Sequence, residues 1–186
     1  MPIYLNKWQV TLYPSASRRP CLAFSTLPVR LWYNDFVDYE GYEADGAADD
    51  LSSFEFLSVG RRGKFLKLIV FKPTEYDNLF NLVFGDMTTG GRLDVNSISD
   101  NGDRNKILAT IFSAIDKYTE RYPGRMIYFT GSTEARTRLY RMAIGLYLEE
   151  LSLTYEIFAQ MKSQDQFIKF QKNMEISAFV VKRKAR

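Results

Sequence analysis

The stretch "FEFLSVGRRGKFLKLIVFK", residues 54–72, decides the fold class. Apolar side chains alternate with polar or small ones over residues 54–60, and Arg-Arg-Gly then interrupts the pattern. Alternation returns in residues 64–72 and becomes continuously apolar. A period of two is typical of a strand with one buried face, and a short break containing glycine between two such runs indicates a β-hairpin. We therefore expect a sheet that starts from this hairpin.

Further strands and two helices follow the hairpin in the sequence. The remaining strands are expected at residues 79–87, 125–131, 154–162, 166–171 and 178–184. One helix is expected before Pro123, because apolar residues from Ile107 to Tyr118 share one helical face, and a second from about Thr133 to Leu151. The order β-β-β-α-β-α-β-β-β predicts an α+β fold, with a mixed or antiparallel sheet of about six to seven strands and two helices packed on one face.

Residues 1–50 differ from the rest of the chain. Prolines interrupt them at positions 14, 20 and 28, and seven acids without a base lie between Asp35 and Asp50. The interpretation is an N-terminal extension (1–50) that is partly extended and ends in an exposed acidic linker, followed by a single α+β domain (51–186). Full exposure of its aromatic residues would leave a large apolar patch, so we expect them to pack on the domain. These residues are Trp8, Tyr13, Trp32, Tyr33 and Phe36.

The composition excludes several kinds of chemistry. The chain has no histidine and one cysteine, Cys21, which rules out His-activated nucleophiles, His-ligated metals and an internal disulfide. An enzyme would depend on carboxylates, Lys, Tyr, Ser or Thr, so a non-enzymatic role without a cofactor is favoured. The net charge of +3 does not by itself indicate nucleic-acid binding. With no membrane-length apolar run, we expect a cytoplasmic protein without membrane contact.

One segment with chemical character, "MIYFTGSTEARTRLYRM", covers residues 126–142. At 100° per residue, Arg138 and Arg141 fall opposite the apolar stripe of the second helix. Arg136 projects into that stripe, beside Tyr140 and at the positive end of the helix dipole. The expected stripe consists of Ala135, Leu139, Met142, Ala143, Leu146 and Tyr147. An inward arginine needs a partner, because an unpaired buried guanidinium is costly.

Two kinds of partner for the Arg136 guanidinium stay open. A carboxylate, Asp86 or Asp103, could pair with it as a purely structural contact. Alternatively, a phosphate could sit at the helix N-terminus, held by the amides after Gly131 and by Arg136. The predicted anion site consists of Gly131, Ser132, Thr133, Arg136 and Tyr140, with Asp86, Asp103 and Lys106 as supporting residues. Ser132 or Thr133 is equally explained as an ordinary N-cap.

Two further features are weaker. In "SDNGD", residues 99–103, Asp100, Asn101 and Asp103 could ligate Mg²⁺, although a turn followed by an N-cap explains them as well. The hairpin turn places Arg61, Arg62 and Lys64 on a loop between glycines, where they could contact a nucleic-acid backbone or simply be solvated. No metal site is predicted.

The segments 54–71, 81–87, 99–111 and 128–142 resemble a family of small uncharacterised bacterial proteins, seen mostly in Bacteroidetes. That family carries a "YEFxSxGxxGxIxKxVxF" hairpin and a "GSTxARTRLYRM" segment, and the resemblance covers roughly residues 54–184. It implies a domain of unknown function and no established activity. The arginine-rich segment carries over as Gly131, Ser132, Thr133, Arg136, Thr137, Arg138, Tyr140 and Arg141.

Three functional hypotheses follow. The leading one is a protein that binds a phosphate-bearing ligand or nucleic acid through residues 131–141, with a toxin–antitoxin or defence role resting on analogy alone. The alternative is a non-catalytic protein-interaction module, in which the aromatic extension docks a partner or a second copy. The third is a nuclease that uses Asp86 and Asp103 with Mg²⁺, the only reading that needs a cofactor.

Overall fold

The computed structural model describes residues 40–162 and 166–185. The predictions for the aromatic residues of 1–39 lie outside this part of the chain. The strands are β1 (Asp45–Gly46), β2 (Ser53–Gly60), β3 (Gly63–Pro73), β4 (Leu79–Met87), β5 (Leu93–Asp94), β6 (Met126–Phe129), β7 (Tyr155–Met161), β8 (Phe167–Lys169) and β9 (Ile176–Arg183). The helices are α2 (Arg104–Arg121), α3 (Glu134–Leu146) and α4 (Leu148–Thr154).

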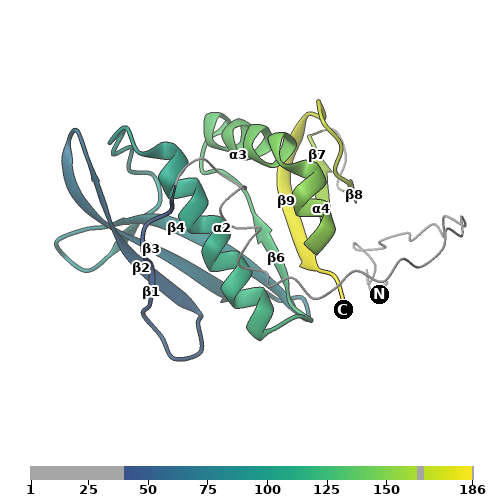
Figure 1. Ribbon diagram of the computed structural model, residues 1–186, viewed down its shortest axis with the longest axis horizontal. Coiled ribbons are helices and arrows are strands. Elements are labelled where there is room, and N and C mark those ends of the chain that lie inside the picture. The colour runs from purple at the N-terminus through teal and green to yellow at the C-terminus, as the bar shows by residue number, and fades with distance from the viewer. Residues whose placement is uncertain (1–39, 163–165, 186) are drawn as a thin grey trace, which may run out of the picture.

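One mixed sheet organises the molecule (Figure 1). Its strand order is β1-β2-β3-β4-β6-β9-β7-β8, with β5 beside β4, and the β4–β6 pair is parallel while the other pairs are antiparallel. The α+β class is confirmed, but the described residues form nine strands and three helices instead of six to seven and two. Strands β1 and β5 have two residues each, too few for any periodic signal. The expected second helix is divided at Tyr147, two residues after Gly145, a poor helix former.

The predicted hairpin is confirmed as β2 and β3. Their register runs from Ser53 opposite Val70 to Gly60 opposite Gly63, which leaves Arg61 and Arg62 as the turn. Alternate residues of the sheet face the three helices and form one core with them. Tyr118 of α2 lies fully buried at its centre, with its ring stacked on that of Phe71 at 4.1 Å.

Part of the predicted acidic linker packs against this core. Ala44 is buried, the ring of Tyr42 stacks on Phe56, and the Tyr42 amide donates to the Thr110 hydroxyl at 2.9 Å. Residues 42–46 therefore lie against α2 and β2, while the side chains of Glu43 and Asp45 are exposed.

Helix α3 faces the core with a different side from the one expected. Thr137 and Ile144 are its buried residues, whereas Met142 is 59% exposed and Leu146 is 69% exposed. The predicted stripe was therefore wrong as the core-facing side. Tyr140 explains the choice, because its ring meets Phe129 of β6 edge-on at 5.9 Å and packs on the core. The chain thus leaves an apolar stripe of α3 at the surface.

The hairpin turn is fastened to the loop that precedes α2. Asn101 is almost fully buried: its carbonyl accepts from the Arg61 amide, and its side chain accepts from the Arg62 amide and donates to the Gly63 carbonyl. Gly60 makes this approach feasible, because a Cβ there would lie 2.0 Å from the Asn101 carbonyl oxygen.

We expect Gly60→Ala to destabilise the protein by about 1–3 kcal/mol, the usual cost of overpacking, because backbone must move to admit the methyl group. Gly124→Ala is the matched control, since a Cβ at Gly124 meets nothing within 4 Å. Urea unfolding of both variants measures the difference. Equal midpoints for Gly60→Ala and wild type would contradict the fixed turn.

Candidate functional site

Arg136 holds the loop between β5 and α2. Its guanidinium donates to the Val95 carbonyl at 2.5 Å, to the Ser97 carbonyl, and to the Ser132 hydroxyl at 2.7 Å. No carboxylate forms an ion pair with Arg136 among residues 40–162 and 166–185. The inward arginine therefore binds backbone carbonyl oxygens. The sequence analysis had named a carboxylate or a phosphate as its partner, and not a carbonyl group.

The residues before Arg136 place it at the start of the helix. Thr133 is the N-cap, and its hydroxyl accepts from the Arg136 amide at 3.3 Å. Gly131 lies against the first turn, where a Cβ would be 2.3 Å from the Thr137 nitrogen, and its own amide donates to the Thr137 hydroxyl. Gly-Ser-Thr thus forms the N-terminal cap of α3, and the Gly131 amide already donates a hydrogen bond within the protein. Burial raises the pKa of Tyr140, which stays neutral, while the charge of Arg136 opposes that rise.

A buried ion pair secures the same loop from the sheet. Lys67 and Asp86 lie opposite each other on β3 and β4 and pair directly, with the Lys67 side chain only 3% exposed. Lys67 also donates to the Ser99 hydroxyl at 2.9 Å, and the Ser97 hydroxyl donates to Asp86 at 3.0 Å. Asp86, Ser97 and Arg136 therefore belong to one connected network.

Asp103 and Lys106 belong to a different set of contacts. Asp103 accepts from the Tyr42 hydroxyl at 2.7 Å and from the Ser58 hydroxyl at 2.6 Å. The Lys106 ammonium lies 4.4 Å from the centre of the Tyr42 ring. Burial and the Asp103 carboxylate raise the pKa of Tyr42, which keeps its hydroxyl a donor. The structure shows no contact between this set and Ser132 or Arg136.

The basic hairpin turn remains at the surface. Arg61, Arg62 and Lys64 are exposed, and Arg62 makes a solvent-exposed ion pair with Asp100 at 3.3 Å. Their side chains are accessible to a ligand, and none of them lines either of the two hollows that flank α3.

Two adjoining hollows flank α3. The first, which we call the α3 N-terminal cavity, has a volume of about 630 Å³. Its lining includes three cations (Arg138, Arg141, Lys162), two carboxylates (Glu134, Glu175) and the residues Gly131, Ser132, Thr133, Ala135, Thr137, Ile176 and Ser177. Glu134 and Lys162 pair at 2.8 Å, which lowers the pKa of Glu134 and raises that of Lys162, so both are charged near neutral pH.

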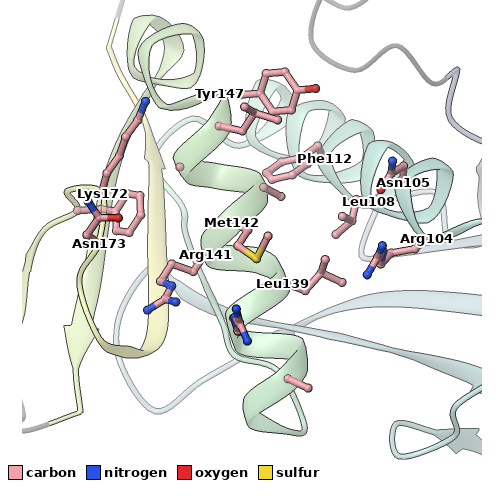
Figure 2. A pocket seen from close by; sticks show the side chains of 16 residues that line it. Arg104, Asn105, Leu108, Phe112, Leu139, Arg141, Met142, Tyr147, Lys172 and Asn173 are labelled. Atoms are coloured by element: carbon pink, nitrogen blue, oxygen red, sulfur yellow. The ribbon is translucent and has the colours of Figure 1, made fainter.

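The second hollow, the α2–α3 groove, has a volume of about 900 Å³ (Figure 2). Leu139 and Met142 of α3 face Leu108 and Phe112 of α2 across it. Its basic residues are Arg104, Arg138, Arg141 and Lys172, and the described residues that line it include no carboxylate. Arg138 and Arg141 border both hollows.

The sequence profile of one protein family matches residues 38–184. The chain belongs to DUF6934, a family of unknown function. Membership agrees with the expected domain of unknown function, and it carries no activity. No curated protein and no solved structure is significantly similar to the chain. None of the helices in the described part of this family member is long and apolar enough to cross a membrane.

Sequence reasoning did not single out Lys67, and it named Arg138 and Arg141 in the arginine-rich segment without including them in the predicted anion site. A signal for Lys67 was present: it shares the period-two face of Phe65, Ile69 and Phe71, so its side chain had to enter the core and find an anion. Arg138 and Arg141 carried no such signal, because their side of the helix was expected to face solvent alone.

We expect Arg136→Met to destabilise the protein by about 1.5–3 kcal/mol, because hydrogen bonds from a charged donor to the loop carbonyls are lost. Arg138→Met, on an exposed residue of the same helix, should change stability by less than about 0.5 kcal/mol. Urea unfolding gives both values, and amide exchange of residues 95–99 should speed up in the first variant only. Unchanged stability of Arg136→Met would contradict a structural role.

Proposed function

We propose that the protein is a non-catalytic binding protein that holds a phosphate group of its ligand, such as a nucleic-acid backbone, in the α3 N-terminal cavity. The proposal is carried by one observation: Arg138, Arg141 and the start of α3 border the same hollow. The first-turn amides of Glu134 and Ala135 have no acceptor one turn earlier, so they can donate to an anion.

Arg136 contacts one lining residue of this cavity, Ser132. It donates to the Ser132 hydroxyl oxygen, which leaves the hydroxyl hydrogen of Ser132 free to point toward a ligand. Arg141 is held in place because it donates to the Met174 carbonyl at 2.9 Å. Among residues 40–162 and 166–185, Arg138 donates to no carbonyl oxygen in this way, and it remains exposed, as expected for a direct phosphate ligand.

The electrostatic balance of the cavity favours an anion. Glu134 is neutralised by Lys162, so Arg138 and Arg141 face a single remaining carboxylate, that of Glu175. The dipole of α3 adds a partial positive charge at the same end.

The geometry does not support the nuclease hypothesis. Asp86 is held by Lys67 and Ser97, and Asp103 by Tyr42 and Ser58, so each carboxylate is engaged by protein donors in a separate network. The toxin–antitoxin or defence role stays a hypothesis from analogy.

We expect a fluorescently labelled single-stranded oligonucleotide to bind the protein at low salt, as measured by anisotropy, and pyrophosphate to compete if the cavity recognises phosphate alone. Arg138→Met should weaken binding and reduce the slope of log affinity against log salt by about 0.7, the contribution of one phosphate contact to a single strand. The urea midpoint should stay that of wild type.

Lys64→Met at the hairpin turn is the matched control and should leave the salt slope unchanged. A loss of slope in Lys64→Met instead of Arg138→Met would move the contact to the hairpin. Failure of both probes to bind at low salt would reject the proposed function.

A second candidate function, protein association, is favoured by the side of the sheet opposite the helices. Leu57 and Leu66 lie directly opposite each other on β2 and β3, and they are 44% and 42% exposed. Val59 on the same side is 50% exposed. Adjacent exposed apolar side chains on a sheet are typical of a contact surface.

If this surface joins two copies, the mass measured by light scattering should rise with protein concentration. Leu66→Asp should then keep the protein monomeric, because an isologous contact would bury two carboxylates without partners. Leu153→Asp, on an exposed residue of α4, is the control. A constant monomer mass in wild type would reject this candidate.

A further inference from the structure

The exposed apolar stripe of α3 forms part of a groove that a ligand or chain segment can occupy. Met142 and Leu146 line the α2–α3 groove and are 59% and 69% exposed. Together with Leu139, Leu108 and Phe112 they form an apolar floor shared by two helices (Figure 2). Contiguous exposed apolar surface, in contrast to single scattered apolar residues, is typical of an interaction site.

The charges around the groove define the chemistry of that occupant. Figure 2 shows Leu139 and Met142 between Arg104 of α2 on one side and Lys172 of the β8–β9 connection on the other. Four cations and, among the described lining residues, no carboxylate favour a segment that is apolar and acidic at once.

The chain itself contains such a segment. In "LWYNDFVDY", residues 31–39, six of the nine residues are aromatic or aliphatic, and the two charged residues are Asp35 and Asp38. No lysine or arginine occurs between Leu31 and Asp50. We propose that residues 31–38 dock in the α2–α3 groove of the same molecule, with Trp32 and Phe36 on its apolar floor and the two aspartates toward its arginines.

The start of the described chain places this segment within reach. Gly41 lies against α2, where a Cβ would be 3.2 Å from the Thr110 nitrogen, and Tyr42 donates to the hydroxyl of that residue. Leu108 and Phe112, two residues away on the same helix, belong to the groove. Crossing a helix about 10–12 Å wide takes roughly three to four extended residues.

Covalent linkage also lowers the affinity that docking requires. A segment joined by a few residues experiences an effective concentration on the order of millimolar, so a modest contact suffices to keep it bound. A separate acidic partner would need a much stronger interface at cellular concentrations. The intramolecular segment is therefore the occupant that the observations favour, and this docking does not depend on phosphate binding at the α3 N-terminal cavity.

The two tryptophans of the chain, Trp8 and Trp32, both precede residue 40, so the domain itself contributes no tryptophan signal. In full-length Trp8→Phe, fluorescence therefore reports Trp32 alone. Docking predicts emission shifted to the blue of the urea-unfolded chain and protection from acrylamide quenching. Met142→Asp in this background should shift the emission to the red and remove the protection, because a carboxylate replaces the apolar floor.

Three controls make the test specific. Leu153→Asp on α4 and Leu66→Asp on the opposite side of the sheet should leave Trp32 unchanged. Arg138→Glu should weaken the protection, and adding Asp35→Lys should restore it, because the pair is then reversed. Urea midpoints of all variants verify that the domain stays folded.

Several results would overturn the proposal. Trp32 emission equal to that of the unfolded chain would show that the segment does not dock. A response to Leu66→Asp in place of Met142→Asp would move the docking site to the sheet. A blue shift that grows with protein concentration would assign the groove to a second copy of the chain.

Discussion

Two cations inside the fold, Lys67 and Arg136, both depend on the loop between β5 and α2. Lys67 enters the core because β3 alternates, and its ammonium must be met by Asp86 and the Ser99 hydroxyl. Arg136 reaches the same loop from α3 and binds two of its carbonyl oxygens. An uncompensated buried charge would cost several kcal/mol, so the loop has essentially one acceptable path. The loop leads directly into α2, so these contacts tie the start of α2 to β3, β4 and α3.

The same arrangement separates internal cations from those left for a ligand. Lys67 and Arg136 bind oxygen atoms of the protein itself. Arg183 does the same, because it pairs with Asp116 and links β9 to α2. Arg138 stays exposed. Arg141 donates to the Met174 carbonyl and also lines both hollows. Since the two hollows share both arginines, occupancy of one changes the electrostatic potential of the other. A ligand of the α3 N-terminal cavity and a segment in the α2–α3 groove would thus compete for the same charges.

Much of the fold could be read from local patterns. The hairpin, the longer strands and α2 follow from periods of two and of about 3.6, because each has one face in the core. Thr133 is a good N-cap in isolation and caps α3 in the structure. The two-residue strands β1 and β5 could not be predicted, because only their pairing with a neighbouring strand defines them. The helix break at Tyr147 could not be predicted either, because the apolar periodicity continues across it.

What the sequence by itself determined is therefore the class of the fold, the hairpin, the histidine-free chemistry and the importance of one inward arginine. Only the tertiary structure decided which face of α3 meets the sheet, since the helix carries two apolar faces and a periodic pattern cannot rank them. The face with Tyr140 and Ile144 meets the sheet because these side chains pack against Phe129 and the core. The partners of Arg136 were equally beyond local reasoning: they are carbonyl oxygens about 40 residues away, and every residue type carries that acceptor.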